Sequence, residues 1–166
     1  ASMDANTTGR NNVAYGMNSL GGNTTAEENC AIGTNSLFTN TTGTANTGLG
    51  TYSLQNNSTA SNNTGLGYKA LFANTTGADN VAVGSFALDA STTGYGVVAI
   101  GHEALTSDTK GDYSVAIGYD ALKTQNFTTA TNAYNTALGA YAGAAVTTGI
   151  NNTLIGGLAG DAITTA

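Results

Sequence analysis

The chain has 166 residues, enough for one ordinary domain, with 40% apolar residues, only 8% charged residues and a formal net charge of −6. A typical soluble domain has about 25% charged residues, and four scattered basic residues cannot form a phosphate-binding surface, so we expect no nucleic-acid partner. No stretch approaches the roughly 20 apolar residues that cross a bilayer, so we expect no membrane insertion by this segment.

A short lead-in, residues 1–5, precedes the first repeat, and Ala1-Ser2-Met3 resembles a cloning remnant. The chain then repeats the unit Asn-x-Ala-Ile/Leu/Val-Gly-x-x-Ala/Ser-Leu, followed by a polar stretch that ends in Thr-Thr-Gly. Its first glycine recurs every 17 residues, with one step of 21, at Gly16, Gly33, Gly50, Gly67, Gly84, Gly101, Gly118, Gly139 and Gly156. This period predicts one repeat domain over residues 1–166.

The residues before each repeat glycine are typical of a β-strand. Large residues stand directly before the glycine (Tyr15, Ile32, Leu49, Leu66, Val83, Ile100, Ile117, Leu138 and Ile155) and two positions earlier (Val13, Cys30, Thr47, Thr64, Val81, Val98, Val115, Thr136 and Thr153). Because side chains alternate along a strand, both columns share one face, which we expect to be the core. Between them lies a column of Ala or Gly in eight units, which we expect to pack against sister chains.

The second half of each unit adds a column of Leu that we also expect to be buried. Thr-Thr-Gly predicts a turn, and the Asn that opens most units is expected to form a side-chain amide ladder. Seventeen residues would then form two strands of about five residues and two turns. The sequence thus predicts an all-β fold, a parallel β-roll or β-solenoid of nine 17-residue coils stacked at about 4.8 Å.

Several positions depart from the regular unit. Cys30 is the single cysteine, and we expect it to be a small buried hydrophobe. The longer step places extra residues near residues 127–134, in a loop that should protrude. Gly143 and Gly160 replace the Leu of the last two units, and residues 164–166 begin a tenth unit. We therefore expect the chain to be a fragment of a longer fibre.

Two segments carry a resemblance to a known family. Ser-Val-Ala-Ile-Gly at 114–118 and Asn-Val-Ala-Val-Gly at 80–84 resemble the Asn-Ser-Val-Ala-Ile-Gly motif of YadA-like head repeats in trimeric autotransporter adhesins. The longer unit is similar to repeats of phage tail fibres, and the resemblance covers residues 6–166. It implies a parallel homotrimer of β-rolls, an adhesive role on a bacterial cell surface or virion tail fibre outside the cell, and a host-surface glycan or protein as receptor.

Recognition is expected in the two variable residues that follow the repeat glycine, because turn residues of a regular scaffold can change without disturbing the core. The candidate receptor-binding residues are Tyr52, Tyr68, Lys69, Phe86, His102, Glu103, Tyr119, Asp120 and Tyr141. The aromatic members would line one edge of the rod, where they could stack on sugars, pack on protein or merely cover neighbouring coils. The loop at 127–134 is a second candidate.

The sequence offers little for catalysis. His102 stands beside Glu103, but no second His, Cys cluster or matched carboxylate pair accompanies them. We therefore expect no enzyme activity, no metal and no cofactor. Two alternatives to an adhesive fibre stay open. One is an ice-binding β-solenoid, because Thr pairs recur, although adjacent residues point to opposite sides of an extended chain. The other is a purely mechanical fibre spacer.

Overall fold

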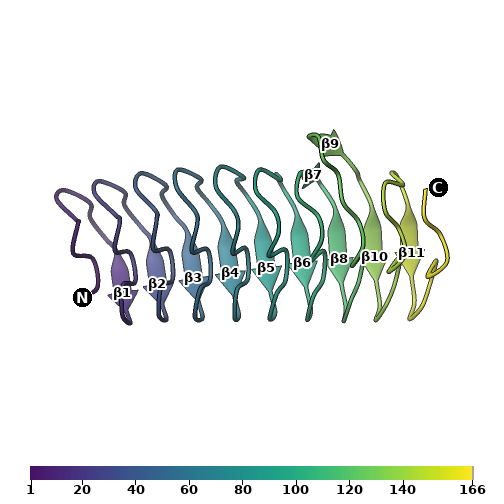
Figure 1. Cartoon of the computed structure of the whole chain (residues 1–166), viewed down its shortest axis with the longest axis horizontal. Helices are drawn as coiled ribbons and strands as arrows, with labels where there is room; N and C mark the ends of the chain where they lie inside the picture. Colours follow the sequence, from purple (N-terminus) through teal and green to yellow (C-terminus); the bar gives the residue numbers. More distant parts are fainter. Residues whose placement is uncertain (166) are drawn as a thin grey trace.

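The computed structural model describes residues 1–165, and short strands stack side by side along a rod (Figure 1). Nine strands form one parallel sheet in the order β1-β2-β3-β4-β5-β6-β8-β10-β11. Their bounds are β1 Val13–Tyr15, β2 Cys30–Ile32, β3 Thr47–Leu49, β4 Thr64–Leu66, β5 Val81–Val83, β6 Val98–Ile100, β8 Val115–Ile117, β10 Thr136–Leu138 and β11 Thr153–Ile155. The chain makes about eight turns without a helix among its described residues, which confirms the predicted parallel β-solenoid.

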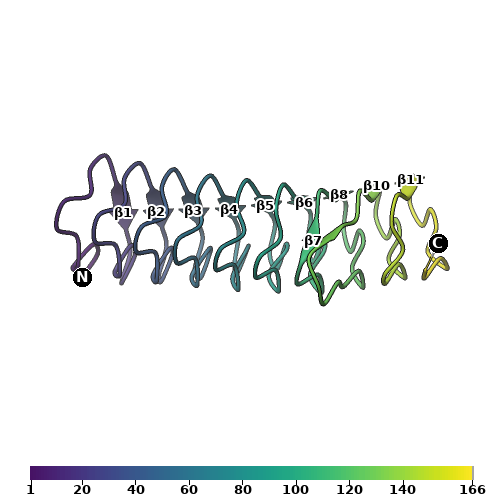
Figure 2. The same cartoon turned by 90° about the horizontal axis from the view of Figure 1, so that it is seen from above.

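Each coil contributes one three-residue strand to this sheet, and only two coils within residues 1–165 carry a second, two-residue strand, so the prediction of two strands of about five residues in every unit is wrong. Seen from above, the strands of the nine-stranded sheet form one wall of the rod, and turns form most of the rest (Figure 2). The turns bend because residues such as Lys69 (φ 57°) and Leu71 (φ 53°) are in the left-handed region, which extended chains do not use. The turn backbone still bonds to the next coil, since the Leu71 N–H donates to the Ala87 carbonyl at 3.1 Å.

The two faces of the sheet are the reverse of the prediction. The small residues of the middle column, such as Ala82 and Ala99, are fully buried inside their own coil, whereas Leu49 and Leu66 point outward and are 43% exposed. Alternation along the strand was assigned correctly, but its inside and outside were exchanged. The coil is thin, and the Leu column of the turns occupies its interior, so only Ala or Gly fits on the inward side of the strand. The small column therefore needs no sister chain to cover it.

Cys30 lies in the first column of that outward face, opposite Val13 in the sheet register, and is only partly buried. The expectation that it is a buried hydrophobe followed from the reversed faces and is wrong.

The interior is filled by side chains of complementary size. A Cβ on Gly48 would lie 2.5 Å from Ser36 Oγ, and the Ser36 hydroxyl donates to the Gly48 carbonyl at 3.0 Å. A serine in one coil is thus matched by a glycine in the next. Further along, both positions are alanine, and Ala87 and Ala99 are both fully buried. Tight packing of this kind leaves no room for larger residues.

The last coils exchange large and small residues between strand and turn. Gly143 and Gly160 keep the left-handed backbone of the Leu that they replace, with φ of 63° and 66°. Leu154 stands at the strand position that is Ala or Gly elsewhere, and a Cβ on Gly143 would lie 2.8 Å from its Cδ1. One leucine from the strand therefore fills the space of two from the turns, and the coil keeps its path.

Buried asparagines connect the coils in two columns. The expected side-chain ladder is present, since Asn46 Nδ2 donates to Asn29 Oδ1 at 3.2 Å and to the Ala60 carbonyl at 2.8 Å. A second ladder was not predicted; in it, Asn57 Nδ2 donates to Asn40 Oδ1 at 2.9 Å. Both ladders pair buried polar groups along the rod, as a stable interior requires, and among the described residues the second ends at Asn74, whose Oδ1 has no partner.

The repeat glycine has both a conformational and a steric reason. Gly33 has φ of 134°, and a Cβ there would lie 2.5 Å from the carbonyl oxygen of Gly50 in the next coil. Such closeness to backbone atoms admits no side chain. Gly156, in β11's coil, has φ of 123° but would meet nothing within 4 Å.

The longer step forms a small extension of the rod, visible above the main row of strands in Figure 1. β7 (Gly111–Asp112) and β9 (Thr131–Asn132) pair there as a separate parallel sheet. Asp108 occupies a position of the second asparagine column and accepts from Gln125 Nε2 at 2.6 Å and from the Gly111 N–H at 3.0 Å. Burial raises the pKa of its carboxyl group. The Asp108 carboxylate thus accepts hydrogen bonds from backbone N–H groups of this extension, at Gly111 and Phe127.

Candidate functional site

The aromatic residues predicted to line one edge of the rod form a continuous row. Neighbouring ring centroids lie 5.1 to 6.3 Å apart, and the members of this aromatic row are Tyr52, Tyr68, Phe86, His102, Tyr119 and Tyr141. The contacts are mostly edge-to-face, and His102 stacks on Tyr119 with an interplanar angle of 9°. The row therefore covers neighbouring coils, and it also leaves Tyr68, Tyr119 and Tyr141 more than 40% exposed.

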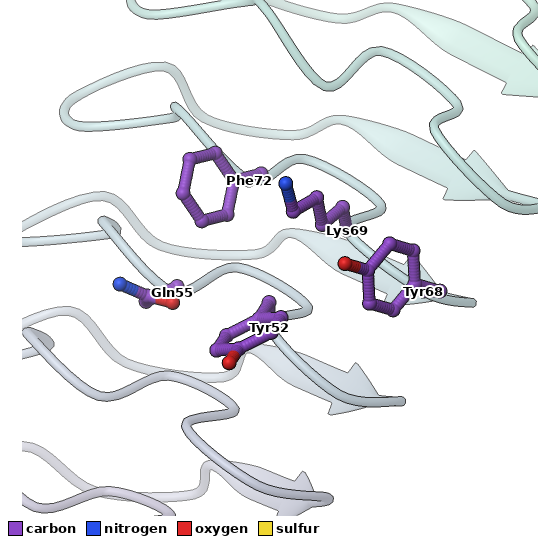
Figure 3. A pocket seen from close by; sticks show the side chains of 5 residues that line it. All are labelled: Tyr52, Gln55, Tyr68, Lys69 and Phe72. Atoms are coloured by element: carbon purple, nitrogen blue, oxygen red, sulfur yellow. The ribbon is translucent and has the colours of Figure 1, made fainter.

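An open groove of about 330 Å³ lies at one end of this row. Two neighbouring coils line it, with Tyr52 and Gln55 from one and Tyr68, Lys69 and Phe72 from the other (Figure 3). Its volume is at the lower end of the range for small-molecule sites. The groove combines aromatic surfaces with two phenolic hydroxyls, an amide and an ammonium group.

The ammonium group of Lys69 is held among aromatic rings. Its Nζ lies 5.2 Å from the ring centroid of Phe72, 5.6 Å from that of Tyr68 and 5.8 Å from that of Phe86. Each contact of this kind stabilises an exposed cation by about 0.5–1 kcal/mol. Within residues 1–165, Lys69 forms no ion pair. The groove thus contains a positioned positive charge that no carboxylate of a described residue neutralises by direct contact.

Gln55 and Phe72 were missed because the prediction stopped at the two residues after the repeat glycine. The turn closes with the Phe72 N–H donating to the Lys69 carbonyl at 3.2 Å. This hydrogen bond brings the side chain of Phe72 to the same edge as that of Lys69. Lys123 occupies the corresponding position of its coil and donates its N–H to the Asp120 carbonyl at 3.3 Å. Aligning the fifth residue after each glycine at the 17-residue period would have found all three.

The other predicted site residues form an ion-pair cluster. Lys123 Nζ lies 2.6 Å from Glu103 Oε2 and 2.9 Å from Asp120 Oδ2, and His102 Nε2 lies 3.8 Å from Glu103 Oε1. The hydrogen bond from Lys123 lowers the pKa of Glu103, and the two carboxylates raise the pKa of Lys123. His102, Glu103 and Asp120 each offer a ligand atom within 4.8 Å of the others. Because Lys123 already supplies a cation there, we assign no metal to this cluster.

A second aromatic row was not predicted. Tyr95 meets Tyr113 edge to face at a centroid distance of 5.7 Å, Tyr113 stacks on Tyr134 at 5.4 Å, and all three are more than 40% exposed. Tyr134 belongs to the loop at 127–134, whereas Phe127 at its other end is buried. The loop is therefore anchored at Phe127 and presents part of its length to solvent.

A third surface is the outward side of the nine-stranded sheet, here called the outward face. It consists of two ranks: Val13, Cys30, Thr47, Thr64, Val81, Val98, Val115, Thr136 and Thr153; and Tyr15, Ile32, Leu49, Leu66, Val83, Ile100, Ile117, Leu138 and Ile155. None of these residues is charged. Val13, Leu49, Leu66 and Leu138 in these ranks are 43–53% exposed, and exposed apolar patches are typical of interaction surfaces.

The fold and these surfaces define a parallel β-solenoid with an aromatic edge and an apolar sheet face. The chain matches no protein-family model, no curated protein and no solved structure. No helix of the described residues is long and apolar enough to cross a membrane. The resemblance to YadA-like head repeats therefore remains a prediction from sequence motifs.

Proposed function

We propose that the chain is a segment of an adhesive fibre, a trimeric adhesin head or a phage tail fibre, whose outward faces pack together in a parallel homotrimer. Its turns then display receptor-binding residues outside the cell, on a bacterial surface or a virion. The role is structural and adhesive rather than catalytic. The observation that carries the proposal is the uncharged, two-rank outward face.

The outward face fits a second copy of the chain better than an irregular partner. Its side chains repeat once per coil, because the strands are paired in register from β1 to β11. A partner that contacts every coil must have the same spacing, and another copy has it without adjustment. The second rank contains Ile, Leu, Val or Tyr in every unit, and covering these mostly half-buried side chains contributes part of the roughly 1.5–3 kcal/mol that complete burial gives each. Many weak, identical contacts would therefore add up along the rod. The parallel arrangement and the number three come from the sequence resemblance.

The mass of the protein in solution tests this proposal. We expect about three times the chain mass of 16.5 kDa by analytical ultracentrifugation. Ile100→Glu places a charge in the outward face and should give a folded monomer. Thr93→Glu adds the same charge to an exposed turn residue and should leave the trimer intact. A wild-type protein that is a monomer at all concentrations would refute the assembly.

Ice binding is a second candidate, favoured by the regularity of the outward face and by the Thr residues in its first rank. The Thr pairs that first suggested it support the fold instead, since Thr41 Oγ1 donates to the Ser58 carbonyl at 3.0 Å and Thr75 Oγ1 to the Thr92 carbonyl at 2.9 Å. The large apolar second rank favours contact with protein. If the wild type were a monomer with thermal hysteresis activity, and if Ile100→Glu abolished that activity, ice binding would be established and would replace the fibre proposal. A mechanical spacer would form the trimer and bind no receptor.

A further inference from the structure

The groove at Tyr52 and Lys69 has the composition of a site for a charged sugar. We propose that it binds a saccharide that carries a carboxylate, such as a sialic or uronic acid. This inference rests on the proposed adhesive function and names the receptor class that the aromatic edge would recognise.

The aromatic rings supply a stacking surface. Tyr52 and Tyr68 come from adjacent coils, with ring centroids 5.9 Å apart and an interplanar angle of 71°, so the groove offers ring surfaces in two orientations. The C–H face of a pyranose ring is apolar and packs on such a surface, while its hydroxyls remain free to hydrogen-bond. The phenolic hydroxyls and the Gln55 amide can both donate and accept. A ligand that has an apolar face and many hydroxyls satisfies both kinds of group.

The ammonium group of Lys69 selects for negative charge. The chain has a net charge of −6, which disfavours anions in general, so a site for an anion needs a local cation. Lys69 supplies it and forms no ion pair with any residue that the structure describes, and its Nζ lies over the rings of Tyr68 and Phe72 at the groove. By contrast, the ammonium group of Lys123 is bound by Glu103 and Asp120. Among the aromatic turns, the groove is therefore the place where an acidic group gains most.

The size of the groove favours a sugar over an acidic peptide. About 330 Å³ accommodates one or two sugar rings, and the site spans only two coils. An extended peptide would bind best by adding a strand to an open sheet edge, whereas the lining residues belong to turns. The groove offers no ladder of backbone groups for a peptide.

Binding of 3′-sialyllactose and lactose, measured by calorimetry or ligand-observed NMR, tests the proposal. We expect 3′-sialyllactose to bind about tenfold more tightly than lactose, as one charge-assisted hydrogen bond would give. Lys69→Gln should remove this preference, and Tyr68→Ala should weaken both sugars. Lys110→Gln, which removes a charge elsewhere, and Tyr95→Ala, which removes a ring outside the aromatic row, should change neither affinity.

Three results of these sugar titrations would overturn the proposal. They are equal affinity for both sugars, a preference that survives Lys69→Gln, and no binding of either sugar. Displacement of 3′-sialyllactose by a polyglutamate peptide of higher affinity would likewise assign the groove to a peptide. The mass of the same samples separates this inference from the fibre proposal, because a trimer that binds no sugar refutes only the sugar site.

Discussion

The two sides of the nine-stranded sheet differ in the size and the exposure of their side chains. On the inward side, Ala, Gly and the Leu of the turns fill a space that excludes every larger residue, and the contacts lie within the chain. On the outward side, side chains such as Leu138 are large and 46% exposed, although their neighbour Ala137 is fully buried. The difference shows that the small residues serve the fold of one chain, whereas the large ones remain on the surface that we propose meets a partner.

Substitution of the glycine that follows each strand should lower the free energy of unfolding most, because this glycine has a left-handed backbone and, before the last coil, close contact with the next coil. Gly33→Ala combines strained backbone with an overlap against Gly50, and we expect it to lower the free energy of unfolding by about 3 kcal/mol or more. Gly156→Ala shares the backbone strain but meets no neighbouring atom, so its loss should be about half as large or less. Denaturant titration of both variants measures the difference. Equal losses would show that conformation alone requires the glycine.

The inward and outward sides can be compared at adjacent residues. Ala137→Leu should overpack the interior and destabilise the fold by about 1–3 kcal/mol. Leu138→Ala should change the free energy of unfolding of the chain by about 1 kcal/mol or less and instead weaken assembly. Unfolding titrations and sedimentation, carried out on both variants, separate the two effects. If Ala137→Leu were tolerated and only assembly failed, the assignment of the faces would be reversed again.

Asp108 should make a smaller contribution that depends on pH. Burial raises the pKa of its carboxyl group in the folded chain, so the protonated form is favoured there. The resulting stabilisation is complete below the ordinary pKa of about 3.9 and is lost as pH rises through the raised value. Asp108→Asn, whose amide can point toward the unpartnered Ser91 Oγ, lacks this titration.

The difference in free energy of unfolding between Asp108→Asn and the wild type should therefore become more favourable to the variant between about pH 4 and pH 7. Urea titrations across this range measure it. Asp89→Asn should show the same trend, because the pKa of this second carboxyl group is also raised mainly by burial. A difference that is constant with pH would contradict the account of Asp108.

The ion-pair cluster should contribute least. Lys123→Ala removes two ion pairs of a side chain that is 38% exposed, and such pairs contribute about 0–1 kcal/mol. The melting temperature should change little, and added salt should reduce the difference further. A loss as large as that of Ala137→Leu would show that the cluster supports the fold.

The sequence predicted the solenoid because glycine, leucine and asparagine recur at one period, and these columns are required for stacking. It predicted which strand residues share a face, but alternation does not tell which face is inside. That choice depends on the thickness of the coil, which follows from left-handed turn residues such as Leu71 that the pattern does not reveal. The aromatic row was found from its variable positions. The groove was found only in part, since the turn that brings Phe72 to Lys69 replaced a predicted strand.

Reactivity of the single thiol tests the outward face most directly. Cys30 lies in that face, so a thiol reagent such as Ellman's reagent should react slowly with the assembled wild type and at least about tenfold faster with the folded monomer Ile100→Glu. Slow reaction in both proteins would contradict the outward position of Cys30. Equally fast reaction in both would show that no partner covers this side of the sheet.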